Sequence, residues 1–222
     1  MELTALKPRI ALNKAFLKVK PNRPEIELFK KNLISLIDNI DEYETEEFHK
    51  NLVSDFLKNT YYGTNHYINT KDRKDLVIHN AASAHSTVGV ILEAKSPSNR
   101  AEMLRPDNIN NKAFQELILY YLRERITHKN LEIKHLIVTN IYEWYIFDAH
   151  VFEKEFAQNK PLLKKFTDFE EGRSGGYKTD FFYKEIAAPA IEAMRHEVCF
   201  TYFNIQQKNT SRLNKSRIFN IY

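Results

Sequence analysis

The chain has little cysteine and little glycine. Its single cysteine, Cys199, cannot form a disulfide framework within the chain, so the sequence favours a reducing compartment, the cytoplasm. Its five glycines are too few to favour a glycine-rich loop of the kind that cradles cofactor phosphates. We therefore expect a cytoplasmic protein that binds no nucleotide-type cofactor.

Long apolar runs and zinc-binding patterns are missing as well. No apolar run approaches the roughly 20 residues that span a bilayer, and the N-terminus lacks a signal-peptide core. The eight histidines show no His-x-x-x-His spacing, and no Cys-x-x-Cys occurs. These absences predict a soluble protein with no membrane partner and no zinc site.

The net charge of +4 comes from the end of the chain. The last sixteen residues contain no acid and four basic residues, Lys208, Arg212, Lys215 and Arg217, which leaves residues 1 to 206 formally neutral. Affinity for phosphate would therefore have to come from local patches. One candidate is this tail and another is the N-terminal arm, although either can equally be a solvated terminus. In the arm the acids Glu2, Glu25 and Glu27 are outnumbered by Lys7, Arg9, Lys14, Lys18, Lys20, Arg23, Lys30 and Lys31.

Two apolar runs, residues 75–79 and 88–93, predict neighbouring strands joined by a loop of small and polar residues. If the chain folds back about Ala84, Asp75 lies opposite Glu93, with Cβ atoms about 5 Å apart. Because strand side chains repeat with period two, Lys95 shares the face of Glu93. We therefore expect two carboxylates and one ammonium at one end of a hairpin.

Such a group of charges favours a divalent cation. Two close carboxylates repel each other and raise each other's pKa unless a cation lies between them. Mg²⁺ suits a site in which carboxylates, waters and substrate phosphates complete an octahedron, and a nearby lysine can activate water or neutralise charge on a phosphate. This chemistry is typical of phosphodiester hydrolysis. The alternative is a solvated salt-bridge cluster, since acid-x-lysine triplets also occur at residues 72–74 and 132–134.

Alternating strand and helix patterns predict an α/β fold with a mixed central β-sheet flanked by helices. The expected helices cover residues 25–40, 45–58, 112–127, 152–158, 161–169 and 179–195. The expected strands lie near residue 67 and at 75–79, 88–93, 135–139 and 143–148, with a last apolar stretch at 198–205. We expect three parts: a basic N-terminal arm (1–24), one domain (25–205) and a basic polar tail or start of a linker (206–222).

The arrangement of Asp75, Glu93 and Lys95 resembles the PD-(D/E)XK nuclease superfamily. Longer blocks extend the resemblance from about Leu12 to Asn204, namely Leu92–Pro97, Lys112–Arg125, Lys134–Ala149 and Thr179–Tyr183. Together these blocks are similar to the N-terminal nuclease region of type IIG restriction enzymes. Those enzymes fuse a nuclease to an adenine-specific DNA methyltransferase in one chain.

The resemblance implies a restriction-endonuclease-like core with additional helices, and a DNA endonuclease of bacterial defence that cuts double-stranded DNA with Mg²⁺ or Mn²⁺. It assigns the metal to Asp75 and Glu93, and the positioning or activation of the attacking water to Lys95. It also points to Glu47 as an assisting metal ligand on a preceding helix, because Lys50 and an apolar pair follow at the family's spacing. Glu47 can instead be one of several acids that favour the start of that helix.

A Gln-x-x-x-Tyr motif on the helix after the Glu-x-Lys strand is common in such nucleases. Gln115 matches the glutamine and supports the site in this assignment, but Leu119 occupies the tyrosine position and Tyr120 comes one residue later. The alternative for Gln115 is a surface helix residue.

The methyltransferase motifs of such fusions, a glycine-rich loop and Asn-Pro-Pro-Tyr, do not occur in this chain. Methyltransferase and target-recognition domains are therefore expected as partners in a full-length protein. The chain is interpreted as a nuclease domain cut from a larger protein, a stand-alone relative or a truncated remnant. The alternative function is a catalytically silent DNA-binding or assembly module that retains the nuclease fold.

Overall fold

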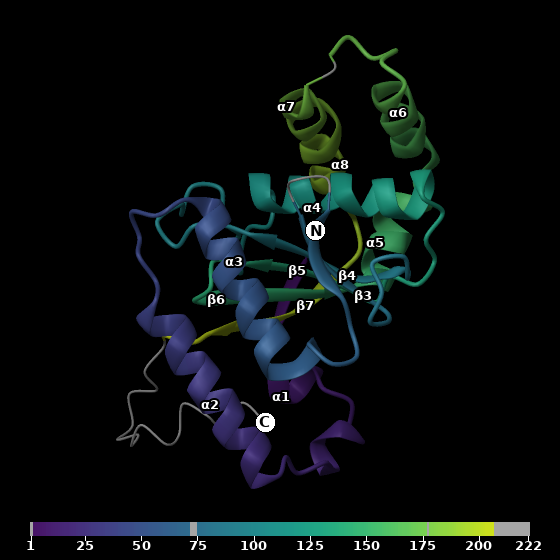
Figure 1. Ribbon diagram of the computed structural model, residues 1–222. Helices are drawn as coiled ribbons and strands as arrows, with labels where there is room; N and C mark the ends of the chain where they lie inside the picture. Colours follow the sequence, from purple (N-terminus) through teal and green to yellow (C-terminus); the bar gives the residue numbers. More distant parts are fainter. Residues whose placement is uncertain (1, 72–74, 177, 207–222) are drawn as a thin grey trace.

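A mixed β-sheet organises the protein (Figure 1). The computed structural model describes residues 2–71, 75–176 and 178–206, and the side chains of Lys71 and Asp75 lie outside this description. Within the described residues the sheet has seven strands in the order β1-β7-β6-β5-β4-β3-β2. They are β1 (Leu3–Leu6), β2 (Ile68–Lys71), β3 (Asp75–His79), β4 (Val88–Ala94), β5 (His135–Thr139), β6 (Glu143–Asp148) and β7 (Val198–Asn204). The pairs β1/β7 and β4/β5 are parallel and the others antiparallel, which confirms the α/β class.

The helices follow the expected positions closely. The α-helices are α1 (Pro8–Ala11), α2 (Arg23–Asp38), α3 (Glu46–Leu57), α4 (Lys112–Leu122), α5 (Ala149–Phe152), α6 (Lys160–Glu170), α7 (Thr179–Phe181) and α8 (Ala188–Glu192). A 3-10 turn, η1 (Phe16–Lys18), lies in the arm, and π-helical turns extend four of the helices: η2 (Lys58–Tyr62), η3 (Arg123–Thr127), η4 (Glu153–Ala157) and η5 (Phe182–Ala187).

Two helical layers cover the sheet (Figure 1). Helices α2 and α3 bury Leu33, Leu36 and Val53 against one face. Helices α4 to α8 cover the other face, where α4 lies against β4 and β5 and buries residues on all sides of its axis. A helix buried in this way is fixed by packing, so charged side chains on it occupy defined positions.

The hairpin of β3 and β4 has the expected register. Leu76 pairs with Leu92 and Val77 with Ile91, as folding back about Ala84 requires. Continuing this register by one residue sets the backbone of Asp75 opposite Glu93. A β-bulge between Ile78 and His79 shifts the pairing only at the other end of the hairpin.

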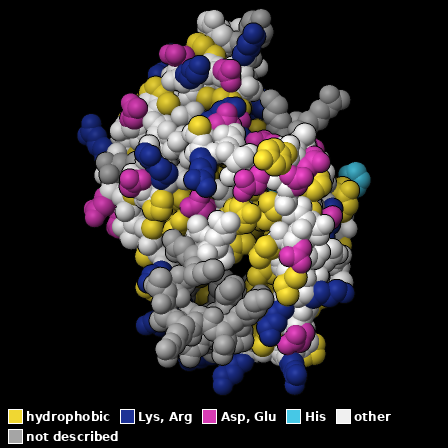
Figure 2. Space-filling view, turned by 90° about the vertical axis from the view of Figure 1, so that its left-hand side faces the viewer, with side chains coloured by type: hydrophobic (Ala, Val, Ile, Leu, Met, Phe, Trp, Pro, Cys, Tyr) yellow, Lys and Arg dark blue, Asp and Glu magenta, His cyan; other side chains and the backbone are white. Residues whose placement is uncertain are grey.

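The N-terminal arm is partly built into the sheet. Residues 3–6 form the edge strand β1, which pairs with β7, and α1 and η1 follow along the surface. On the face shown in Figure 2, lysine and arginine side chains lie in the upper half and also at the lower end, where the arm and the start of α2 lie. Residues 207–222, which hold the four basic residues of the tail, lie outside the described residues. Among the described helices, none is long and apolar enough to cross a bilayer.

Candidate active site

Lys95 follows directly after β4 and is held there by the neighbouring strand. Its backbone N–H donates to the Thr139 carbonyl of β5 at 2.8 Å, which continues the ladder between the two strands. The side chains of Lys95 and Glu93 are each 2% exposed, and Lys95 Nζ lies 2.9 Å from Glu93 Oε1. The predicted acid-lysine pair is therefore present, and it is buried.

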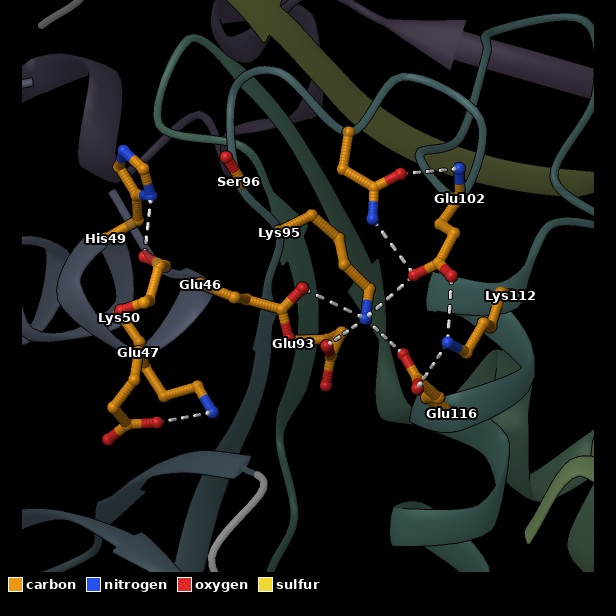
Figure 3. A network of polar contacts seen from close by, with 12 residues as sticks. Glu46, Glu47, His49, Lys50, Glu93, Lys95, Ser96, Glu102, Lys112 and Glu116 are labelled. Atoms are coloured by element: carbon orange, nitrogen blue, oxygen red, sulfur yellow. Dashed lines mark hydrogen bonds and ion pairs between the residues drawn. The ribbon is translucent and has the colours of Figure 1, made fainter. Parts of the chain in front are cut away.

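Four carboxylates surround the Lys95 ammonium (Figure 3). The nearest oxygens are Glu116 Oε2 at 2.5 Å and Glu93 Oε1 at 2.9 Å. Glu46 Oε2 and Glu102 Oε2 are farther away, at 3.5 and 3.6 Å. These acids come from four segments, α4, β4, α3 and the loop between β4 and α4, so the lysine links both helical layers to the sheet.

A second lysine belongs to the same network. Lys112 Nζ lies 2.8 Å from Glu102 Oε1 and 4.0 Å from Glu116 Oε1. With Lys95 included, two ammonium groups face four carboxylates, which leaves a formal excess of two negative charges when all four carboxylates are ionised. Such an excess is unfavourable where water is largely excluded, and a divalent cation would offset it.

Glu93 is the carboxylate most affected by this environment. Its pKa is raised to about 8, mainly by burial and in addition by the nearby Glu116, against the opposing effect of Lys95. Its Oε2 atom is buried and has no hydrogen-bond partner among the described residues. A buried acceptor without a partner is costly, so this oxygen is suited to bind a ligand such as a cation.

The donor set fits Mg²⁺ better than a metal that needs a complete protein cage. Among the described residues, no three His, Cys, Asp or Glu side chains form a ready-made metal site. Mg²⁺ usually takes one or two carboxylates and keeps waters and substrate phosphates as its other ligands. Glu93 Oε2 supplies one such oxygen, and the strand register gives Asp75 as the candidate for a second, although its side chain lies outside the description.

A pocket of about 440 Å³ opens onto the cluster. It is lined by Thr45, Glu46, Glu47, Lys50, Glu93, Lys112, Glu116, Tyr120, Thr179, Asp180 and Tyr183. Burial raises the pKa of Tyr183 to about 12, and the nearby Glu116 adds to this effect. The phenol therefore remains protonated at neutral pH and can donate a hydrogen bond.

Helix α3 contributes two adjacent acids that point in different directions. Thr45 caps the helix, since its side chain accepts from the Phe48 backbone N–H at 3.2 Å, and this places Glu46 and Glu47 in the first turn. Glu46 reaches Lys95, whereas the exposed Glu47 pairs with Lys50 at 3.4 Å and lines the pocket. The sequence interpretation singled out Glu47 and missed Glu46 as the acid that contacts the lysine.

On helix α4, too, the residue that lines the pocket is one position away from the residue singled out from the sequence. Gln115 donates from Nε2 to Asn110 Oδ1 at 2.9 Å and is not among the described residues that line the pocket. Glu116 lines the pocket, as do Lys112 one turn before it and Tyr120 one turn after it. The spacing of four residues between these side chains is the signal that identifies this face of the helix.

Comparison with known proteins places the chain in a family without giving an activity. No curated protein and no solved structure matches it. The model of one family, described as "Domain of unknown function (DUF7149)", matches residues 6–222, so the chain belongs to this family.

Proposed function

We propose that the chain is a Mg²⁺-dependent DNA endonuclease domain that hydrolyses phosphodiester bonds, as in type IIG restriction enzymes. The observation that carries this proposal is the buried Glu93–Lys95 pair at the end of β4, where one oxygen of Glu93 has no hydrogen-bond partner among the residues that the structure describes. A pocket gives access to Glu93, and the surrounding carboxylates outnumber the two ammonium groups, so a cation would offset their charge.

The residues have separate roles in this mechanism. Glu93, Asp75 and, from the pocket rim, Glu47 would hold Mg²⁺, which supplies positive charge that stabilises the attacked phosphate and makes nearby water more acidic. Burial lowers the pKa of Lys95, but Glu93 and Glu116 raise it more, so the pKa lies above its ordinary value. Lys95 is therefore a permanent cation, which orients water or phosphate oxygen by donating hydrogen bonds rather than by accepting a proton.

The local architecture supports a restriction-endonuclease-like core. A helix that carries acids, α3, precedes the three antiparallel strands β2 to β4, and α4 follows the Glu-x-Lys strand. On α4, Glu116 and Tyr120 have the Gln-x-x-x-Tyr spacing with glutamate in place of glutamine. Gln115 would then support the site only indirectly, through Asn110.

The proposed substrate is double-stranded DNA. Lys50 and Lys112 line the pocket on α3 and α4, where each can exchange a carboxylate partner for a phosphate. The basic arm offers further phosphate contacts away from the pocket. In a longer protein, methyltransferase and target-recognition domains would supply the choice of DNA sequence.

A plasmid-nicking assay tests the proposal. Purified wild-type protein should nick supercoiled DNA in Mg²⁺ or Mn²⁺ and stop when a chelator is added. Glu93→Gln keeps the shape of the side chain but removes its charge, so this variant should be inactive. Because it is purified in the same way as wild type, it also controls for contaminating nucleases.

One observation favours the alternative of a catalytically silent DNA-binding or assembly module. Four carboxylates already surround Lys95, and a lysine held in this way has few directions left in which to donate to substrate. Wild-type protein that binds DNA but does not nick it with either metal would replace the nuclease proposal with this one.

A further inference from the structure

The nearest contact of Lys95 is Glu116, and not Gln115, the neighbouring residue to which the resemblance assigned a supporting role. We infer that Glu116 is a positioning residue that holds the Lys95 ammonium in place from helix α4. The role of the ammonium in the reaction rests on the proposed function, whereas the positioning itself does not.

The contact joins two rigid elements. Lys95 Cα is fixed by the ladder between β4 and β5, but the four-carbon stem of a lysine is flexible and needs a fixed acceptor at its far end. Glu116 supplies this acceptor from a helix that is buried on all sides. Its side chain is 10% exposed, and its two oxygens face the two ammonium groups, at 2.5 Å from Lys95 and 4.0 Å from Lys112.

The other three acids are less suited to this task. Glu46 and Glu102 are farther from the ammonium and more exposed, at 38% and 29%, so water weakens their attraction. Glu93 is close, but a cation at its second oxygen would draw its negative charge away from the lysine. Glu116 would then remain as the short, buried ion-pair contact of Lys95.

A purely structural role for Glu116 predicts a different result. If the contact mainly stabilised the fold, Glu116→Gln would lower the melting temperature. The carboxylates of the cluster outnumber its two ammonium groups, so under our inference the same change relieves repulsion and leaves the melting temperature in chelator unchanged or raised. The positioning role is therefore separable from stability.

The test compares Glu116→Ala and Glu116→Gln with the control Glu153→Gln. Glu153 also holds a cation, Arg125, at 2.8 Å, but lies outside the residues that line the pocket. We would measure kcat and KM for plasmid nicking in Mg²⁺, and the rate at which an amine reagent modifies Lys95, read by mass spectrometry.

In Glu116→Ala, kcat should fall about 100-fold with little change in KM, because a misplaced catalytic group costs about this much. Lys95 should also be modified several-fold faster than in wild type. Glu116→Gln should recover part of both effects, since its amide oxygen keeps a partial negative charge that attracts the ammonium but lacks the full charge of the carboxylate. The control should match wild type in kcat and in Lys95 modification.

Equal kcat and equal Lys95 modification in Glu116→Ala and the control would overturn the inference. If Glu116→Ala does not fold, the same comparison is made with Glu116→Gln. If wild-type protein does not nick DNA, the proposed function fails, and the modification rate of Lys95 alone then decides whether Glu116 positions it.

Discussion

Lys95 Nζ lies closer to Glu116 Oε2 on helix α4, at 2.5 Å, than to Glu93 Oε1 on its own strand, at 2.9 Å. The ammonium is therefore a junction between sheet and helix. From sequence, the expected site was an open hairpin end with two carboxylates and a lysine. In the structure Lys95 is instead enclosed by acids from four segments. Replacing Lys95 is therefore expected to affect stability as well as activity.

Lys95→Met should destabilise the protein as well as abolish nicking. Removing the cation leaves four carboxylates with one remaining lysine, and breaking a buried ion pair in this way costs about 3–5 kcal/mol of the free energy of unfolding. Urea unfolding in chelator measures the loss. Mg²⁺ should restore more stability to this variant than to wild type, because the ion replaces the missing positive charge.

Lys112→Met is the matched control for this prediction. Its side chain is 40% exposed, so solvent screens the carboxylates that it leaves behind, and the loss of stability should be clearly smaller. If Lys95→Met unfolded at the wild-type urea concentration, the carboxylates would not depend on Lys95, and the charge argument for the site would be wrong.

Local sequence patterns predicted most elements of the fold because those elements carry their own signals. The β3–β4 register follows from two continuous apolar runs around a short loop, and the pairing of Leu76 with Leu92 confirms it. Strand β1 was missed since four residues of mixed character carry no clear period. Its partner β7 lies at the other end of the chain, where no local pattern can indicate the pairing.

Strand patterns brought Glu93 and Lys95 together, whereas the helix residues that contact Lys95 lie one position away from the predicted Glu47 and Gln115. A shift of one position turns a side chain by about 100° around a helix, which separates Glu46 from Glu47 and Glu116 from Gln115. Matching residue types to a motif does not identify the inward face, whereas the buried stripe through Val53 and Leu57 on α3 would have done so. Glu102 lies in a loop and had no periodic signal at all.

Stability in the absence of metal should fall as the pH rises toward 8. Burial raises the pKa of Glu93 from 4.5 to about 8, so between these values the folded protein keeps a proton that the unfolded chain releases. The folded state then binds more protons, and linkage makes it less stable as pH increases, until Glu93 is ionised in both states. Urea midpoints of wild type in chelator, from about pH 5 to about pH 8, measure this slope.

Glu93→Gln isolates the contribution of Glu93 to that slope, because all other titrating groups remain. The variant should lose less stability than wild type over the same range of pH. Parallel curves for the two proteins would show that Glu93 is already ionised in the folded state, contrary to the shift described above.

DNA binding should depend steeply on salt, and the arm should contribute to the slope. Deleting the arm would remove strand β1, so charge substitutions are the cleaner change. Replacing Lys14, Lys18 and Lys20 by glutamine should reduce the slope of log affinity against log salt by up to about 3, at about 0.9 per lost phosphate contact. The matched control replaces Lys160, Lys164 and Lys165 on α6, and an equal slope in both triple variants would remove the arm from the DNA interface.

The last prediction concerns Asp75. If Asp75 and Glu93 hold a cation together, Mg²⁺ should stabilise wild type by mass action, by about 2.7 kcal/mol at 100 times its dissociation constant. Asp75→Asn should lose most of this gain, because one anionic ligand becomes neutral.

Asp55→Asn is the control, since Asp55 is an exposed acid on α3 that is not among the residues lining the pocket. Thermal melts across a Mg²⁺ series give the comparison. An equal gain in all three proteins would mean that the ion binds elsewhere, and that the excess negative charge at Lys95 is balanced without a metal held by Asp75.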